Sequence, residues 1–279
     1  FGSDYGVANN SGKILLKEAR SILKLGKSYG VDILDTAIAY GDSEQNLGQI
    51  GVEGFGIITK LPALPKGEVD IADWVRAEVA NSLDRMQKKS LYGLLLHRPD
   101  ELMGPRGADL YRGLESLKNE GKIGKIGVSV YSMNELEELT PRYKLDLVQA
   151  PFNLVDRSLV DSGWLAKLKL AGVEVHVRSI FLQGLLLMPR NAIPVKFLGW
   201  STIWDKWHVW LQKNQITAVE ACLSYVLSCS HIDRVIVGVD TQDQLLEIVN
   251  AANREVLDSY PDIKSDSVDL INPANWGAL

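Results

Sequence analysis

The chain has few cysteines, no long apolar run and no concentration of basic residues. Its two cysteines, Cys222 and Cys229, are seven positions apart in a helical pattern, which is too far for a disulfide. Such sparse cysteine is typical of buried thiols in a reducing compartment, so we predict a cytoplasmic protein. No apolar stretch approaches the roughly 18 residues that span a bilayer. The formal net charge is −5 and no basic run is present, so we expect neither a membrane nor a nucleic acid as partner.

Two chemical signatures are missing as well. No G-x-G-x-x-G motif follows an early apolar run, which argues against an open, doubly wound nucleotide-binding sheet. No two histidines have the spacing of metal ligands, so we expect no metal. His176 falls in the middle of an apolar run, where a packing role is expected, whereas His208 and His231 are expected at the surface.

What the sequence does contain is a regular alternation of apolar and helical segments. Short β-branched runs predict strands at 31–37, 55–60, 92–97, 125–130, 145–150, 173–179 and 235–239. Segments of helical period predict helices at 14–29, 71–88, 109–120, 159–170, 218–227 and 242–252. Capping boxes that begin at Ser132 and Thr241 mark two helix starts directly after strands. The apolar runs are continuous rather than alternating, as is typical of parallel strands covered on both faces.

This alternation predicts an α/β fold with a wholly parallel sheet, a (β/α)8 TIM barrel. The length of 279 residues suits one such barrel, which needs about 250, and we expect a single domain over residues 1–279. The predicted strands are one short of a closed barrel. We therefore expect a truncated first strand that ends at Phe1 and Gly2, with most of it upstream.

Polar residues end several of the predicted strands, which is where barrel enzymes place their chemistry. They are Asp35, Tyr40, Lys60, His97, Ser129, Gln149 and Asn153. An unpaired buried polar group is costly, so several that converge on one rim indicate a functional site.

After the predicted strand at 173–179, residues 181–214 form an excursion too long for an ordinary loop. Its four tryptophans are Trp200, Trp204, Trp207 and Trp210. Their spacing predicts one face of a helix. We expect this face to pack the core of the excursion rather than to contact substrate.

Three motifs in the first half of the chain resemble those of the aldo-keto reductase family. Residues 35–41, followed by Ser43 and Glu44, are similar to the motif after the second barrel strand. Residues 58–60 resemble the strand-three lysine motif, and residues 95–99 the histidine motif. Weaker similarities follow in the family's order at 121–123, 127–129, 149–153, 183–185 and 235–238. The resemblance covers nearly the whole chain and implies an enzyme that reduces an aldehyde or ketone with NADP(H) or NAD(H).

The resemblance implies a role for each of four residues. Tyr40 is the expected proton donor, and Lys60 is expected to lower the pKa of its phenol, which is otherwise about 10 and a poor acid. Asp35 would neutralise the buried Lys60, and His97 would orient the carbonyl oxygen. The structural alternative is an Asp35–Lys60 ion pair that merely closes the barrel.

The family's contacts to the nicotinamide also have counterparts. Ser129 and Gln149 correspond to residues that hold the carboxamide, although Val130 replaces the asparagine that usually follows the serine. Arg178 replaces the tyrosine that stacks on the ring. A planar guanidinium can also stack, so we expect Arg178 beside the nicotinamide or its substrate, with a barrel-rim salt bridge as the alternative. The rest of the strand-seven motif places Ser179, Phe181 and Gly184 at the cofactor.

The adenosine end of the cofactor is expected at the last predicted helix. Gly238 and Gln244 stand where the family often has a lysine and an arginine for the 2′-phosphate of NADP. The helix start at Thr241 offers backbone N–H groups, whereas Asp240 adds a negative charge. Glu247 alone is kept of the acidic and amide pair that follows. These residues predict weak discrimination for NADP, or use of NADH.

Two other functions remain open. A cofactor-binding regulatory protein with little turnover would keep these residues, and Val130 and Arg178 suit such an altered site. A barrel lyase or isomerase would use Lys60 as a Schiff base. For the reductase we expect a small carbonyl substrate, such as a sugar derivative, and a monomer or a weak homo-oligomer.

Overall fold

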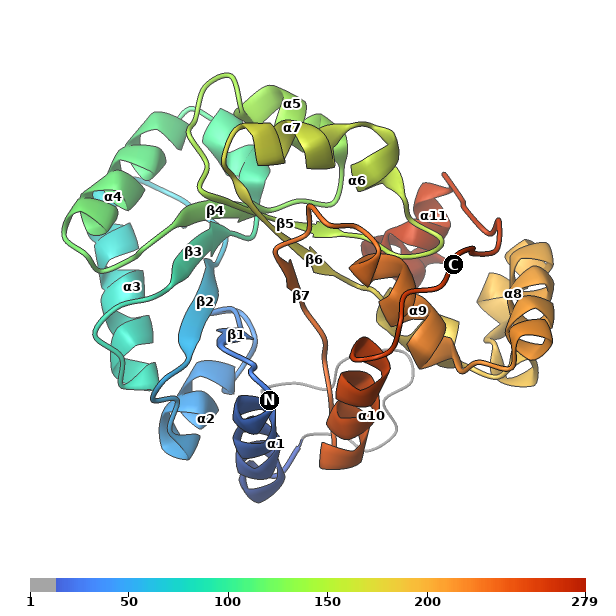
Figure 1. Ribbon diagram of the computed structural model, residues 1–279. Helices are drawn as coiled ribbons and strands as arrows, with labels where there is room; N and C mark the ends of the chain where they lie inside the picture. The colour runs from blue at the N-terminus through green and yellow to red at the C-terminus, as the bar shows by residue number, and fades with distance from the viewer. Residues whose placement is uncertain (1–13) are drawn as a thin grey trace.

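The computed structural model describes residues 14–279, so the expected strand end at Phe1 and Gly2 lies outside the described residues. The sheet has seven strands in the order β1-β2-β3-β4-β5-β6-β7, and each pairs in parallel with its neighbour. They are β1 (Ile33–Asp35), β2 (Gly56–Leu61), β3 (Gly93–Leu96), β4 (Ile126–Ser129), β5 (Leu147–Pro151), β6 (Glu174–Arg178) and β7 (Arg234–Val235). The sheet curls, and helices cover its outer face (Figure 1). This is the predicted α/β fold, with a wholly parallel sheet that curls as in a (β/α)8 barrel.

The helices follow the predicted alternation. They are α1 (Leu16–Ser28), α2 (Ser43–Ile50), α3 (Ile71–Met86), α4 (Gly107–Asn119), α5 (Met133–Leu139), α6 (Ser158–Asp161), α7 (Trp164–Leu170), α8 (Ser201–Asn214), α9 (Ala218–Leu227), α10 (Gln242–Ala252) and α11 (Val268–Ile271). Short 3-10 helices are η1 (Pro99–Met103), η2 (Leu182–Leu187), η3 (Arg190–Ala192), η4 (Val195–Trp200) and η5 (Pro273–Ala278).

Two predicted elements differ in extent. The helix expected at 159–170 is two helices, because Gly163 between α6 and α7 adopts a left-handed φ of 78° that interrupts the helical hydrogen bonding. The strand expected at 235–239 is reduced to Arg234 and Val235, which pair with His176 and Val177 of β6. One further backbone bond, from Ile236 N–H to the Val177 carbonyl, continues the pairing.

Strand geometry explains how an apolar interior supports a polar rim. Ile58, Leu95 and Leu147 form a small buried cluster of their own, with Ile33 packed against it. Side chains two positions apart on a strand point to the same face. The residues two positions after these four are Asp35, Lys60, His97 and Gln149. The apolar cluster is therefore the layer directly beneath the predicted site.

A second polar layer lies at the amino-terminal ends of the strands. Glu174 accepts hydrogen bonds from Tyr92 Oη at 2.8 Å and contacts His176 Nε2 at 2.6 Å. Lys125 forms an ion pair with Glu174 and donates to Tyr92 Oη at 2.8 Å. His176 is completely buried, as the expected packing role requires, and burial lowers the pKa of its imidazole to about 4.

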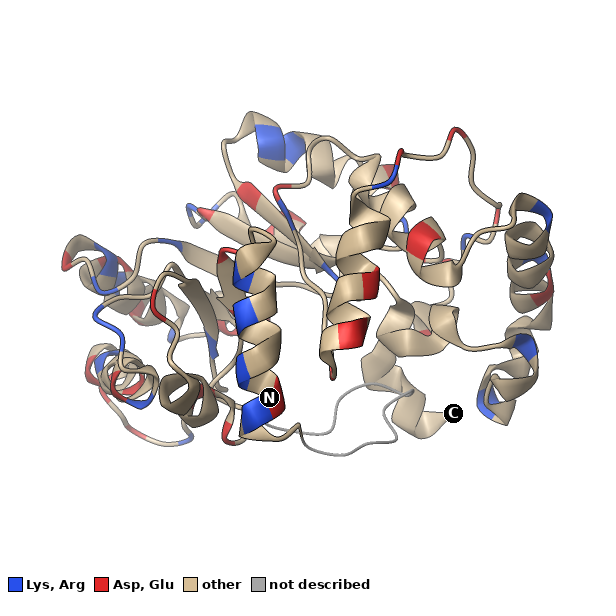
Figure 2. Ribbon diagram, turned by 60° about the horizontal axis from the view of Figure 1, so that its bottom comes forward, with Lys and Arg blue, Asp and Glu red and all other residues tan. Residues whose placement is uncertain are grey.

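Segments far apart in the sequence meet at the seam between β7 and β1. Helices α1 and α10 lie side by side (Figures 1 and 2). The Gln242 N–H, at the start of α10, donates to Glu18 Oε1 of α1 at 3.0 Å. Arg234 of β7 reaches Asp32 Oδ2, just before β1, at 2.8 Å.

The excursion after β6 has a core of its own. Trp204 and Trp207 are fully buried, and their indole N–H groups donate to the carbonyls of Phe197 and Leu186 at 2.9 and 3.0 Å. Trp200 and Trp210 are partly buried against the same cluster. The expectation that these tryptophans pack the excursion is confirmed. Trp276 of η5 joins this core from the carboxyl-terminal end of the chain, edge-on to Phe197.

Cys222 is buried, Cys229 is half-buried, and both are free thiols, as predicted. Burial raises the pKa of both thiols, so neither is an activated nucleophile. None of the helices in the described part of the chain is both long and apolar enough to cross a bilayer.

Candidate functional site

Asp35 and Lys60 form a short ion pair at the carboxyl ends of β1 and β2. The Lys60 ammonium donates to Asp35 Oδ2 at 2.6 Å and to the Thr36 carbonyl at 2.9 Å. Lys60 is only 1% exposed, so its positive charge needs this counter-charge. The pair is present as the sequence predicts.

Tyr40 and His97 complete a compact group around this pair. Tyr40 lies in the turn after β1, where its N–H donates to the Ala37 carbonyl at 3.0 Å. Lys60 Nζ is 5.3 Å from the centre of the Tyr40 ring, and the His97 ring centre is 5.7 Å from it at a steep angle. The structure therefore brings all four predicted residues together, with the Lys60 ammonium facing the phenol ring.

The electrostatics of Tyr40 differ from the prediction. The pKa of its phenol is raised to about 12, first by burial and then by the negative charge of Asp35. The expected lowering by Lys60 is wrong for this structure, because Asp35 at 2.6 Å compensates the ammonium charge. The cation that does lower the pKa of Tyr40 is Arg178.

His97 is held as a neutral imidazole. Burial lowers its pKa below the ordinary value of 6.5, and the positive charges of Lys60 and Arg178 lower it further. A neutral imidazole can donate one N–H to a carbonyl oxygen without bringing a third cation into the site.

Ser129 and Gln149 lie beside this group on adjacent strands, in register with each other. The Gln149 amide donates to Asp35 Oδ1 at 2.8 Å, and Gln149 Oε1 accepts from Ser129 Oγ at a longer 3.3 Å. Both residues are buried. A long hydrogen bond between two buried polar groups is readily exchanged for a bond to another amide, so these residues fit a nicotinamide carboxamide.

Arg178 ends β6 on the same rim. Its guanidinium lies 4.1 Å above the ring of Tyr131 and donates to the Val130 carbonyl at 3.0 Å. The predicted alternative, a rim salt bridge, is wrong within residues 14–279, where no carboxylate lies in ion-pair distance of Arg178. Tyr131, which sequence reasoning missed, immediately follows the Ser129–Val130 segment and is 41% exposed.

The segment after Arg178 turns sharply. Ser179, Leu182 and Gln183 have φ values of 58°, 47° and 56°, which are uncommon for residues other than glycine, and Gly184 has 89°. Asn153 Nδ2 donates to the Ser179 carbonyl at 3.0 Å and ties this turn to β5. The predicted cofactor residues Ser179, Phe181 and Gly184 all lie in this turn. The strain of such positive φ values is tolerated where the backbone of a turn contacts a ligand.

The start of α10 is already occupied by the protein's own oxygens. Thr241 Oγ1 accepts from Gln244 N–H at 3.2 Å, and Glu18 accepts from Gln242 N–H. The predicted capping box is only half formed, because Gln244 Oε1 accepts from the Asp240 N–H at 2.7 Å instead of that of Thr241. The Glu18 carboxylate therefore already holds one N–H group of this helix start.

The remaining two residues predicted at the adenosine end, Gly238 and Glu247, are exposed. The structure therefore brings the residues predicted for catalysis and for the nicotinamide together at one rim, and places those predicted for the adenosine at the seam between β7 and β1. Glu18 carried no sequence signal for this place, because its partner Gln242 is 224 positions away.

Glu44, which the sequence analysis noted only as part of a motif, supports the site. It is 2% exposed and accepts hydrogen bonds from Thr59 at 2.6 Å, Ser82 at 3.1 Å and Arg85 at 2.8 Å. Thr59 precedes Lys60 on β2. The Glu44 carboxylate thus fixes β2 to α2 and α3, and positions Lys60 without facing the rim.

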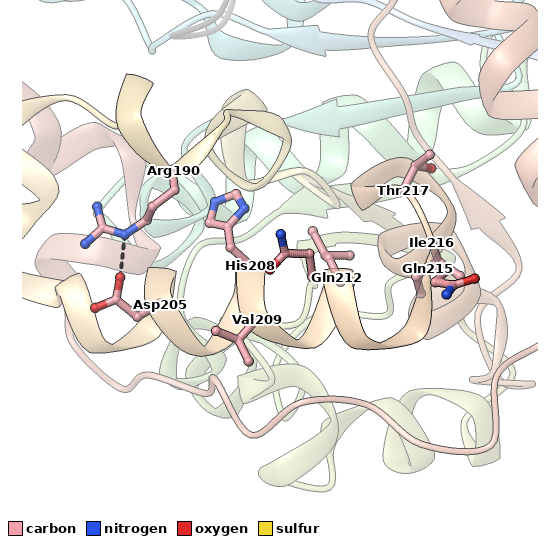
Figure 3. A pocket seen from close by; sticks show the side chains of 9 residues that line it. Arg190, Asp205, His208, Val209, Gln212, Gln215, Ile216 and Thr217 are labelled. Atoms are coloured by element: carbon pink, nitrogen blue, oxygen red, sulfur yellow. Dashed lines mark hydrogen bonds and ion pairs between the residues drawn. The ribbon is translucent and has the colours of Figure 1, made fainter.

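A surface hollow of about 850 Å³ lies elsewhere, along α8 in the excursion (Figure 3). Arg190 and Asp205 form an ion pair of 2.5 Å at one side of it. His208, expected at the surface, is half-buried there, and its Nε2 has no hydrogen-bond partner within the described residues. No residue predicted for the active site lines this hollow.

Known proteins resemble this chain in both sequence and fold. The family model described as "Aldo/keto reductase family" matches residues 5–265. An L-glyceraldehyde 3-phosphate reductase of Escherichia coli O157:H7 is 26% identical over 291 residues, which cover 89% of this chain and 83% of that protein. An NADH-specific methylglyoxal reductase of Escherichia coli K12 is 26% identical over 161 residues, and the match spans about half of its length (49%). An aldo-keto reductase from Bacillus halodurans, in its holo form, has the same fold with a TM-score of 0.72 at 23% identity, over 88% of this chain and 85% of that one.

Proposed function

Because the chain belongs to the aldo-keto reductase family, we propose that it reduces an aldehyde or ketone to the alcohol with a reduced nicotinamide cofactor. One observation carries the proposal. Tyr40, Lys60, Asp35 and His97 meet at one rim of the barrel, with the Lys60 ammonium 5.3 Å from the Tyr40 ring centre. These are the groups that a carbonyl needs for protonation and orientation.

When bound, the cofactor supplies a hydride to the carbonyl carbon. The oxygen then takes the proton from Tyr40 Oη, and the carbonyl becomes an alcohol. A phenol with a pKa of about 12 keeps its proton at neutral pH, so the acid is fully loaded. Arg178 offsets the charge of the phenolate that forms, and His97 donates to the oxygen as its negative charge develops. The phenolate regains a proton from solvent.

We propose NADH as the cofactor. Ser129 and Gln149 would hold the carboxamide, and the turn at 179–184 would contact the rest of the nucleotide. Glu18 and Asp240 support NADH over NADPH, since both place negative charge where a 2′-phosphate would need positive charge. A relative named for NADH-specific reduction is consistent with this choice, although the match spans only about half of that protein.

For the substrate we propose a small sugar-related carbonyl compound. Relatives are named for methylglyoxal, L-glyceraldehyde 3-phosphate and 6-dehydroglucose, all of which are small oxygenated carbonyl compounds. The free thiols suit a reducing cytoplasm, where we place the reaction.

The test is turnover of a carbonyl panel with NADH and Tyr40→Phe, which removes only the acidic hydroxyl. We expect a loss of roughly 10²–10⁴-fold in kcat/KM. Tyr29→Phe, at an exposed residue after α1, is the matched control and should leave turnover unchanged. Tight cofactor binding by the wild-type protein without turnover of any carbonyl would contradict the proposal and favour the regulatory alternative.

A separate experiment tests the choice of cofactor: the protein is titrated with NADH and with NADPH, and binding is followed by fluorescence. We expect tighter binding of NADH, and the double variant Glu18→Gln/Asp240→Asn should raise the affinity for NADPH with little change for NADH. Glu137→Gln, at an exposed residue of α5, is the control for removal of one surface charge. Preference of the wild-type protein for NADPH would overturn the charge argument.

A further inference from the structure

Among residues 14–279, no anion pairs with Arg178 at the mouth of the site. Its guanidinium is half-buried and fixed in place by Tyr131, by the Val130 carbonyl at 3.0 Å and by Ser179 Oγ at 3.4 Å. All three partners are neutral. Lys60, the buried cation of the same rim, is by contrast paired with Asp35.

Asp156, an acid whose pKa the charge of Arg178 affects, does not fill this role. Asp156 is buried, and its Oδ1 accepts from the Ser158 hydroxyl at 2.6 Å and from the Ser158 N–H at 3.1 Å. Arg178 influences its pKa from a distance, yet the two are not in ion-pair contact. A partly buried cation that keeps a free face is stabilised by a bound anion.

The position of Arg178 puts that free face next to the reacting carbonyl. Arg178 lies at the end of β6, two residues after His176, which is in register with Gln149 of β5. The register partner of Arg178 is Pro151, so Arg178 lies one step beyond Gln149 towards the carboxyl end of the sheet. Its charge acts on the pKa of both Tyr40 and His97, the proton donor and the orienting group. Tyr131 is 41% exposed, so the guanidinium lies at the solvent opening of the site.

We infer that Arg178 binds an anionic group of the substrate, a carboxylate or a phosphate next to the carbonyl, so that the enzyme acts on anionic oxo compounds. This inference rests on the proposed reductase function. A guanidinium presents parallel N–H donors that match both anions, and a lysine would not reproduce this geometry.

The experiment compares kcat/KM for matched neutral and anionic carbonyl compounds. Methylglyoxal and pyruvate form the carboxylate arm, and glyceraldehyde and glyceraldehyde 3-phosphate form the phosphate arm. We expect the wild-type enzyme to favour the charged member of at least one pair by at least about 10-fold, with the pair that shows it identifying the anion. Arg178→Met, of similar length, should abolish that ratio, and Arg178→Lys should restore it only in part.

Arg112→Met, at an exposed residue of α4, is the matched control and should leave every ratio unchanged. A second measurement does not depend on the folding of a variant: inorganic phosphate or oxamate should compete with the carbonyl substrate in the wild-type enzyme. Equal kcat/KM within both pairs, or ratios that survive Arg178→Met, would overturn the inference. Turnover of methylglyoxal or glyceraldehyde by the wild-type enzyme keeps the proposed reductase function in place in either case.

Discussion

At the scale of single residues, the site depends on one balanced pair of charges, Lys60 and Asp35. Lys60 is 1% exposed and donates both to Asp35 and to the Thr36 carbonyl. Asp35 in turn accepts from Gln149, which contacts Ser129. This chain of hydrogen bonds links the surroundings of Tyr40 to Ser129 and Gln149, so we expect a change at Lys60 to affect both parts of the site.

Replacement of Lys60 by Met should lower both activity and stability. The variant leaves Asp35 as a poorly exposed carboxylate without its cation, and breaking a buried pair costs about 3–5 kcal/mol. We expect the double variant Asp35→Asn/Lys60→Met to recover most of the lost free energy of unfolding, with no recovery of turnover. Denaturant unfolding and kcat/KM measure the two effects. Equal stability of the single and double variants would show that the pair is not coupled.

His176 predicts acid sensitivity of the fold. Its pKa is lowered to about 4 in the folded chain by burial, with Arg234 and Lys125 adding to the effect against Asp35 and Asp233. The unfolded chain takes up this proton near pH 6.5, so unfolding gains a proton between pH 6.5 and about 4. The contribution of the buried neutral imidazole is present above pH 6.5 and is lost as the pH falls towards 4. We expect the Tm of the wild-type protein to fall more steeply over this range than that of His176→Gln; parallel curves would contradict the assignment.

At the scale of elements, close approach of α2 and α3 holds β2 in place. Glu44 of α2 accepts hydrogen bonds from Ser82 and Arg85 of α3 and from Thr59 of β2. Gly48 lies on the same helix, and a Cβ added there would stand 2.0 Å from the Arg85 carbonyl oxygen. Only a glycine permits the two helix backbones to approach this closely.

Gly48→Ala should therefore separate α2 from α3. We expect a loss of about 1–3 kcal/mol in the free energy of unfolding, the usual cost of overpacking. Gly199→Ala is the matched control, because a Cβ there meets nothing within 4 Å. Thermal unfolding of both variants measures the difference, and an equal Tm for the two would contradict the packing argument.

Local sequence pattern predicted most of the elements and the rim of the site. Continuous apolar runs placed β1 to β6, and the polar residue that ends each run identified Asp35, Lys60 and Gln149. The pattern failed where tertiary contacts decide. The Thr241 capping box is half formed because Gln244 accepts from Asp240 instead. The pKa of Tyr40 rises because the phenol is buried and lies near the negative charge of Asp35. A sequence motif of two residues shows neither how deeply they are buried nor where a third charged residue lies.

At the scale of the whole molecule, the excursion and the carboxyl-terminal segment form one second core. Trp204 and Trp207 are buried in it, and Trp276 packs edge-on against Phe197 at 4.7 Å between ring centres. The Lys196 ammonium donates to the Trp276 carbonyl at 2.6 Å. The carboxyl-terminal segment therefore holds in place the excursion that follows Arg178 and β6.

Trp276→Ala should loosen this core at a cost of about 3–5 kcal/mol, as large aromatic truncations do. Val268→Ala, at a side chain that is 57% exposed, should change the free energy of unfolding little. Hydrogen exchange should show the loss of protection concentrated in α8, with β2 and β3 retained. Uniform loss of protection over the barrel would show that the second core is not a separate unit.

The Arg234–Asp32 contact at the seam has a consequence for how the chain is made. It joins residues 202 positions apart, and closing a loop of that length costs about 5 kcal/mol of chain entropy, which the rest of the barrel has to offset. During synthesis, Asp32 emerges about 200 residues before Arg234, so this contact forms only after β2 to β6 have been made.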